Sequence, residues 1–333
     1  PGWVESREAA PAGDLRMRHL RTHRLPSPGG SPVRDRVPLL WNDDVAMSLA
    51  RPTAADPFLY RNARADEVIY VTRGSGILES QFGNLKYREG DYLVIPRGII
   101  HRVVPDAGDQ IQFVMESRGH IRTPKRYRNH HGQLLEHSPF CERDIRPPEE
   151  LVVHDEVGDF EIVTKVEQNF HRVILDHHPF DTVGWDGYYF PWAFSIHDFE
   201  PIVGRVHQPP PVHQTFEGDG FVVCSFVPRL YDFHPEAVPA PYNHSNVMTD
   251  EVLYYCNDEF MSRAGIETGS ITHHPDGLPH GPQPGRTEAS IGQEKTDELA
   301  VMVDTFKPLT VSRYALDCED LDYPGSWLGE DPK

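Results

Sequence analysis

The sequence is poor in cysteine, with four residues in 333 and no CxxC pair among them. It also begins without the pattern of a secretory signal peptide, and its first residue is Pro1 instead of Met. Disulfide-built secreted proteins carry denser cysteines, so this usage favours a reducing compartment. We therefore expect a cytoplasmic protein. The missing Met is consistent with an upstream segment that this sequence lacks.

Positive charge is also scarce, because 32 Lys and Arg face 51 Asp and Glu, for a formal net charge of -19. Such a field repels nucleic-acid phosphates and anionic lipids, so we expect neither partner. It also disfavours an anionic substrate at long range, unless local cations or a metal hold it. The mean hydropathy is -0.52. No apolar run approaches the ~20 residues that span a bilayer, which argues against a membrane protein.

Proline and glycine, by contrast, are abundant, with 31 and 26 residues. They separate short runs rich in Val, Ile, Phe and Tyr, whereas amphipathic helical patterns of ten or more residues are scarce. Short apolar runs between turn residues are typical of an all-β chain. The length suits two domains of ordinary size. We expect an N-terminal arm (1–36), a first barrel with its connector (37–150) and a second barrel (151–333).

The two halves of the sequence share two motifs, which predicts a duplicated domain. The first motif is DEVIY at 66–70 and DEVLY at 250–254. The second motif is Gly, five residues, Pro, four residues and His, and it ends at His101 in one copy and at His280 in the other. Each motif combines a strand with turn chemistry, so the final His is expected to reach the same barrel mouth as the earlier Glu.

The second copy contains the residues for a metal site. His244 lies seven residues before Glu251, and with His280 these residues form a face of two histidines and one carboxylate. This set leaves coordination positions open on non-haem Fe(II), and it also suits Mn(II) or Zn(II). In the first copy the position seven before Glu67 is Tyr60. We therefore expect metal in the C-terminal barrel and none in the N-terminal barrel.

Several C-terminal motifs, PYNHSN, TDEV and LPHGPQPG among them, resemble the bacterial branch of the homogentisate 1,2-dioxygenase family. The resemblance runs from roughly residue 40 to 327 and implies a bicupin with two jelly-roll barrels and few short helices. It also implies Fe(II) bound by His244, His280 and a carboxylate. Family spacing selects Asp250 as that carboxylate and general cupin spacing selects Glu251. We favour Glu251 because Glu67 holds the same place in the repeat.

The resemblance further implies three catalytic histidines. His207, in RVHQPPP, matches the candidate base near the substrate hydroxyl, His213 lies close to it in sequence, and His274 matches another pocket histidine. The alternative for His207 is a loop histidine that packs against prolines.

By this resemblance the protein is an Fe(II)-dependent, ring-cleaving dioxygenase. Its partners would be O2 and a small aromatic acid, either homogentisate or a close hydroxylated relative, and it would form a homo-oligomer. Two alternatives remain open. One is the same chemistry on gentisate, a salicylate-like acid or a biosynthetic intermediate, and the other is a non-catalytic bicupin that binds a small molecule.

Overall fold

The computed structural model describes residues 3–26 and 29–328, which form two compact units. Each unit is assembled from three stretches of the chain. The first unit comprises Pro1–Ala9, Ser27–Arg122 and Cys141–Asp198. The second unit comprises Ala10–Pro26, Thr123–Phe140 and Phe199–Lys333.

The first unit contains two sheets. One has the strand order β11 (Ile145–Arg146), β14 (Trp192–Ser195), β8 (Asp91–Ile95), β5 (Asp66–Arg73), β10 (Ile111–Ser117), β3 (Val45–Ala50) and β2 (Val37–Trp41). The other has the order β13 (Asn169–His177), β12 (Val157–Val166), β4 (Leu59–Asn62), β9 (His101–Pro105), β6 (Gly76–Ser80) and β7 (Gly83–Tyr87). Two 3-10 turns, Glu142–Asp144 and Ile196–Asp198, complete the unit.

The strand order of the first unit is that of a jelly roll. Counted one to eight from β3 to β10, the strands are arranged 1-8-3-6 in one sheet and 2-7-4-5 in the other. Alternate side chains of each strand point to the same face, and on β5 Ile69 and Val71 enter the apolar core between the sheets. Gly90, from the repeated motif, precedes β8 with φ +88°, a turn conformation that favours glycine.

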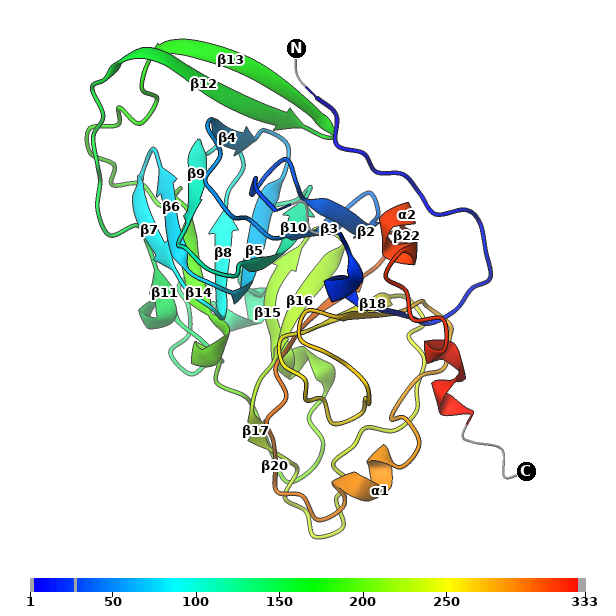
Figure 1. Ribbon diagram of the computed structural model, residues 1–333. Helices are drawn as coiled ribbons and strands as arrows, with labels where there is room; N and C mark the ends of the chain where they lie inside the picture. Colours follow the sequence, from blue (N-terminus) through cyan, green and yellow to red (C-terminus); the bar gives the residue numbers. More distant parts are fainter. Residues whose placement is uncertain (1–2, 27–28, 329–333) are drawn as a thin grey trace. The chain divides into compact units, whose positions relative to one another are not determined.

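The long hairpin of β12 and β13 corrects the predicted domain boundary (Figure 1). β12 pairs in parallel with β4, and β14 pairs with β8. Residues 141–198 therefore belong to the first unit, although the sequence analysis assigned everything after residue 150 to the second barrel. The strand patterns were visible in the sequence, but their pairing partners lie about 100 residues earlier.

The predicted N-terminal arm is shared between the units. Trp3 stacks on Phe170 of β13 with ring centroids 4.5 Å apart, so the first residues pack on the first unit. Residues 10–26 instead belong to the second unit, where β1 (Arg18–Leu20) pairs with β19 (Ile271–His274). Each part of the arm completes a sheet or a core of the unit it joins.

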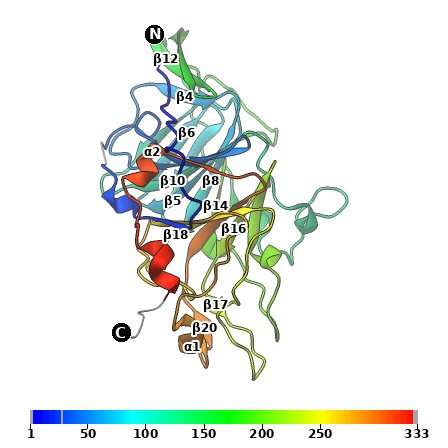
Figure 2. The same cartoon turned by 90° about the vertical axis from the view of Figure 1, so that its right-hand side faces the viewer.

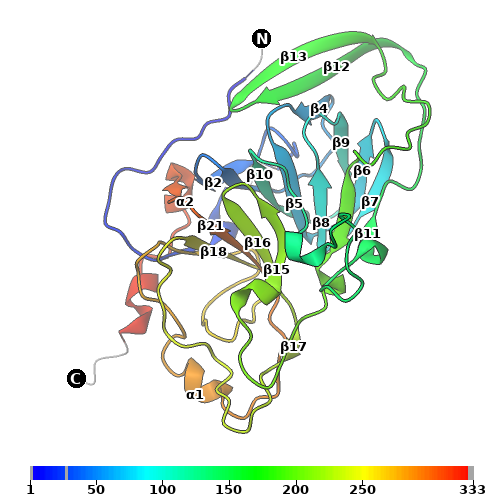
Figure 3. The ribbon, with the colours of Figure 1, turned by 180° about the vertical axis from the view of Figure 1, so that it is seen from behind.

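The second unit is built on one six-stranded antiparallel sheet. Its order is β1, β19, β18 (Asp250–Tyr255), β21 (Ala300–Thr305), β16 (Phe221–Phe226) and β15 (Gln214–Gly218), and Figure 3 shows the last two strands beside β21 and β18. β16, β21, β18 and β19 repeat the 1-8-3-6 order of the first unit. Across the barrel, an isolated bridge between His244 and His280 occupies the place of strands two and seven.

Short elements close the second unit. β17 (Arg229–Leu230) pairs with β20 (Lys295–Thr296) near α1 (Arg286–Ser290), as Figure 2 shows. The remaining elements are β22 (Thr310–Val311), α2 (Arg313–Leu316) and the 3-10 turns Thr22–Arg24, Lys125–Tyr127, Pro210–His213 and Tyr323–Trp327.

The predicted all-β cupin fold with few short helices is confirmed. Within the described residues the α-helices are α1 and α2, of five and four residues. Accordingly, the described part of the chain has no helix with the length and apolar character needed to cross a bilayer.

Candidate metal centre

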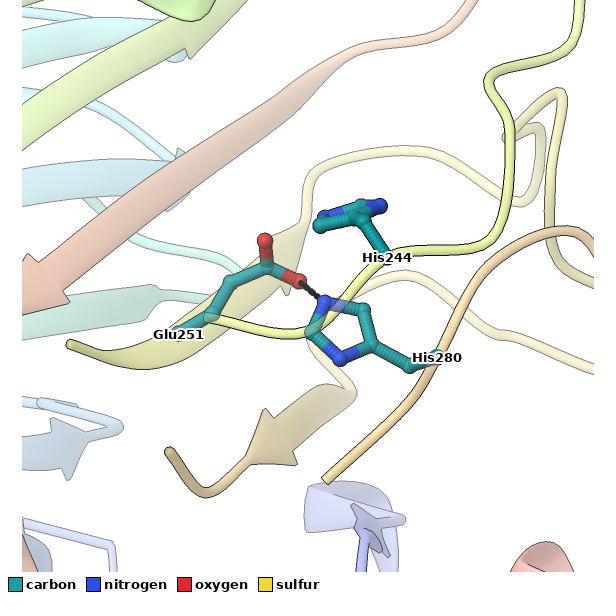
Figure 4. A group of neighbouring side chains, drawn as sticks. All are labelled: His244, Glu251 and His280. Carbon is teal, nitrogen blue, oxygen red and sulfur yellow. Dashed lines mark ion pairs between the residues drawn. The ribbon is translucent and has the colours of Figure 1, made fainter. Parts of the chain in front are cut away.

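The three predicted ligands meet at one end of the second unit (Figure 4). Glu251 is the second residue of β18, and its side chain faces the barrel interior. His244 and His280 lie opposite each other because their backbones exchange two hydrogen bonds: the His244 N–H donates to His280 O at 2.8 Å, and the His280 N–H donates to His244 O at 2.7 Å. The fold thus brings residues 36 positions apart to one point beside Glu251.

The hydrogen bonds of both imidazoles leave Nε2 available for a ligand. His280 Nδ1 lies 3.0 Å from Leu278 O, and His244 Nδ1 lies 3.1 Å from Tyr242 O. A carbonyl only accepts hydrogen bonds, so in the neutral ring Nδ1 carries the proton and Nε2 keeps its lone pair. This is the tautomer that binds a metal through Nε2.

The geometry fits a divalent metal ion. One ligand atom from each of His244, Glu251 and His280 lies within 4.8 Å of the others. His280 Nε2 is buried, lies 3.7 Å from Glu251 Oε1 and has no hydrogen-bond partner among the described residues. An orphaned buried nitrogen is costly unless an ion or water completes it. Two imidazoles and one carboxylate suit Fe(II), with positions left open for other ligands.

The centre opens onto a cavity of about 280 Å³ in the second unit. His280 is 2% exposed, whereas His244 is exposed, so the cluster lies at the boundary between the barrel interior and the surface. Apolar side chains supply much of the wall, among them Phe226, Leu253 and Phe260. A cavity of this kind, with a few convergent polar groups, is typical of a small-molecule site.

Asp250, the other candidate carboxylate, is engaged elsewhere. It accepts hydrogen bonds from the backbone N–H of Asp276 at 2.9 Å and of Leu309 at 2.8 Å, and lies 3.0 Å from His273 Nε2. Adjacent residues on a strand point to opposite faces, so Asp250 lies away from the cavity that Glu251 faces. The structure therefore groups Glu251, and not Asp250, with the two histidines.

His274 lies behind the centre and is absent from the cavity wall. It is fully buried, its Nδ1 lies 2.8 Å from Glu251 Oε1, and its Nε2 lies 3.0 Å from the Tyr323 hydroxyl. Burial lowers the pKa of His274 to about 3, so the neutral ring donates to Glu251 and accepts from Tyr323. Its contacts are those of a residue that positions the carboxylate. No sequence motif pointed to Tyr323.

His207 and His213, the other two predicted catalytic histidines, line the cavity. His213 is 8% exposed and stacks on Phe226 with ring centroids 4.4 Å apart. Burial lowers the pKa of His213 to about 3, which keeps this ring neutral. The His207 side chain is 56% exposed, and its Nδ1 lies 3.6 Å from Asp232 Oδ2. Of these two histidines, only His207 is open to solvent for proton exchange.

Two further features of the cavity were not anticipated from the sequence. Arg229 lies in the wall and forms an ion pair with Glu298 at 2.7 Å. Asp304, on β21, is the cross-strand partner of Glu251. Burial and the charge of Glu251 raise the pKa of Asp304 to about 8. Neither residue belongs to a motif, and an acid near the end of a strand resembles a solvent-facing residue.

In the first unit, the position equivalent to the candidate metal centre holds a different set of side chains. Tyr60 and His101 are register partners, as His244 and His280 are in the second unit. The Tyr60 hydroxyl donates to Glu67 Oε1 at 2.6 Å, and Arg36 Nη2 donates to Glu67 Oε2 at 2.9 Å. Burial by itself would raise the pKa of Glu67, but the Arg36 guanidinium outweighs it and lowers that pKa to about 2. A buried side-chain cation thus neutralises this carboxylate.

A jelly-roll sheet with two imidazoles and a carboxylate at its mouth defines the class: an all-β cupin with a candidate metal centre. Comparison with known proteins is consistent with that class. Residues 51–196 match the family described as homogentisate 1,2-dioxygenase N-terminal. A relative from Saccharolobus solfataricus named "Putative dioxygenase SSO1533" is 46% identical, and the match covers 88% of this chain and 76% of the relative. The chain belongs to the same dioxygenase family as that protein.

More distant relatives are homogentisate 1,2-dioxygenases. The protein from Bradyrhizobium diazoefficiens is 27% identical, with 81% of this chain and 62% of the relative covered. The chain thus spans less than two thirds of that enzyme. Among solved structures, a cupin 2 conserved barrel domain protein from Leptotrichia buccalis aligns over 92% of this chain with 9% identity and a TM-score of 0.40.

Proposed function

We propose that the protein is an Fe(II)-dependent dioxygenase that cleaves the ring of homogentisate or a closely related hydroxylated aromatic acid with O2. The observation that carries the proposal is the meeting of His244, Glu251 and His280 at the mouth of a partly apolar cavity. Membership of a dioxygenase family and the distant homogentisate dioxygenases support the reaction and the substrate class.

The protein residues divide the work between holding the iron and handling the substrate. His244 Nε2, His280 Nε2 and a Glu251 oxygen would hold Fe(II), which when bound supplies open positions for substrate oxygen and O2. Phe226 and Phe260 offer apolar surface to an aromatic ring. His207, the exposed histidine of the wall, would accept the proton of a substrate hydroxyl, because an imidazole nitrogen can act as a general base.

His274 takes a positioning role in this proposal. Its ring is fully buried behind Glu251, and its hydrogen bond fixes the orientation of the carboxylate toward the two ligand imidazoles. Partners of this kind hold ligands in place and tune their basicity. His213, neutral and at the wall, would offer one hydrogen bond to the substrate.

The test is anaerobic reconstitution with Fe(II), followed by metal analysis and oxygen uptake with homogentisate, gentisate and salicylate. We expect one iron per chain, and oxygen uptake with loss of ring absorbance for at least one of these acids. His244→Ala should weaken iron binding by tenfold or more, whereas His131→Ala, which replaces an exposed histidine outside the cavity wall, should not.

Each result leads to a distinct conclusion. Turnover of gentisate or salicylate alone would keep the iron chemistry and replace the substrate. Iron binding without turnover of any hydroxylated aromatic acid would contradict the proposed reaction. Protein with no affinity for Fe(II) would favour a non-catalytic module that binds a small molecule.

A further inference from the structure

Asp304 is a half-buried residue in the cavity wall, and one oxygen of its carboxyl group is enclosed. Its Oδ1 is enclosed and has no partner among the described residues. Burying a carboxyl oxygen without a donor carries a free-energy cost, and native proteins rarely leave such an atom unpaired. This atom therefore calls for an explanation, and its place in the wall points to a ligand.

The first unit shows how a carboxylate at this position is normally satisfied. Glu116 of β10 is the register partner of Glu67, as Asp304 is of Glu251. Lys165 Nζ lies 2.5 Å from Glu116 Oε1, and Arg7 Nη2 lies 3.2 Å from Glu116 Oε2. Arg36 Nη1 also lies 3.6 Å from Glu116 Oε1, so three cations neutralise the carboxylate in the first unit. In the described part of the second unit, no ion pair to Asp304 is found.

The position of Asp304 relative to the metal centre is set by the sheet. Residues that face each other on neighbouring antiparallel strands project to the same side, about 5 Å apart at Cβ. Glu251 and Asp304 are such a pair, and Leu253 and Met302, two residues along each strand, also line the cavity. A small ligand bound beside Glu251 would therefore lie next to Asp304 in the same cavity.

We propose that Asp304 is a specificity-determining residue whose free carboxyl oxygen accepts a hydrogen bond from a hydroxyl group of the bound substrate. The inference rests on the proposed function, because it takes the substrate to be a hydroxylated aromatic acid held at the metal. A carboxylate on the substrate is the weaker partner, because the anionic Glu251 on the neighbouring strand would repel it. A neutral hydroxyl is the group that fits, so Asp304 selects a substrate with a hydroxyl beyond the groups that bind the metal.

The experiment compares acids that differ by one hydroxyl. Zn(II)-loaded protein, which cannot turn over, is titrated calorimetrically with 2,5-dihydroxyphenylacetate and with 2-hydroxyphenylacetate. A second pair consists of 2,5-dihydroxybenzoate and 2-hydroxybenzoate. We expect the wild type to bind the dihydroxy member of at least one pair about tenfold more tightly, the size of one hydrogen bond.

Variants then assign that preference to one side chain. Asp304→Leu should abolish it, and Asp304→Asn should keep part of it, because the amide oxygen still accepts a hydrogen bond. Both variants should retain the Zn(II) content of the wild type. Asp297→Asn, the same exchange at a half-exposed residue away from this cavity, serves as control and should leave the preference intact.

The possible outcomes distinguish a failure of this inference from a failure of the proposed function. A hydroxyl preference that persists in both Asp304 variants overturns the inference and leaves the proposed function standing. Equal binding of both acids of each pair by the wild type also overturns it. If the wild type binds none of the four acids in a metal-dependent way, the proposed function fails and this inference fails with it. Asp304→Asn keeps the test decisive should the Leu variant not fold.

Discussion

Removal of Arg36 is expected to destabilise the first unit strongly. The guanidinium lies 2.9 Å from Glu67 Oε2, and the two side chains are 2% and 1% exposed. In Arg36→Met the carboxylate would keep only the Tyr60 hydroxyl and the Asn62 amide as donors. Breaking a buried ion pair from one side costs about 3–5 kcal/mol. For a domain of this size that corresponds to a fall in Tm of about 6–20 °C.

The assay is differential scanning calorimetry, with an exposed ion pair as the matched control. Arg172 pairs with Glu161 on the β12–β13 hairpin of the same unit, and its side chain is 39% exposed. Exposed pairs contribute about 0–1 kcal/mol, so Arg172→Met should shift the Tm of the first unit by only about 4 °C or less. Because two units can unfold in separate steps, the transition of the first unit must be resolved before values are compared.

A double variant isolates the charge. Arg36→Met together with Glu67→Gln removes both ions, so its Tm should recover most of the loss seen in Arg36→Met alone. If Arg36→Met lost no more stability than Arg172→Met, or if the double variant were as unstable as the single, then Glu67 would not depend on Arg36 for its counter-charge and the reasoning would be wrong.

Three further predictions follow from the same contacts. Tyr323→Phe, which removes the hydroxyl that holds His274, should weaken Co(II) affinity by up to about tenfold and alter the Co(II) absorption spectrum, while unchanged values would deny the hydroxyl a positioning role. The pKa of Glu67 is lowered to about 2 in the folded protein, so the stability that its carboxylate contributes is fully present above the unfolded-state pKa of about 4.5 and is lost as the pH falls toward 2. The Tm of Glu67→Gln should therefore depend less on pH between 4.5 and 2 than the Tm of the wild type. If the two proteins showed the same dependence of Tm on pH, the assignment would be contradicted. Tyr60→His with Arg36→Met should create a second Co(II) site per chain, and a stoichiometry of one by metal titration would show that the backbone of the first unit no longer suits a metal.

The repeat is what allowed the three residues of the candidate centre to be grouped from the sequence. The spacing of the motifs within each copy reflects which jelly-roll strands are neighbours, and the structure brings His244, Glu251 and His280 within reach of one ion. The ambiguity between Asp250 and Glu251 also has a simple physical answer, because adjacent strand residues face opposite sides. The metal itself, the substrate and the oligomeric state stay predictions.

Other features of the fold and of the site depend on long-range strand and side-chain pairings, which cannot be recognised from the neighbouring sequence. Arg36 lies at the end of a stretch that appeared to be a loose arm, and nothing near it indicates that it neutralises Glu67. The β12–β13 hairpin has ordinary strand composition, and only its pairing with β4 assigns it to the first unit. The family pattern indicated His274 as a pocket residue, yet its ring contacts Glu251 and is not part of the cavity wall.

The pairing of β1 with β19 bears on how the chain is made. Leu20 is paired with Ile271, so the ribosome delivers one edge of this sheet roughly 250 residues before its neighbour. At about 5–20 residues per second, the early strand waits on the order of 12–50 s for its partner, a period in which residues 27–122 and 141–198 of the first unit are synthesised. During translation β1 is thus an unpaired strand, and the charges of Arg18 within it and of Arg16 and Arg21 beside it disfavour aggregation in that interval.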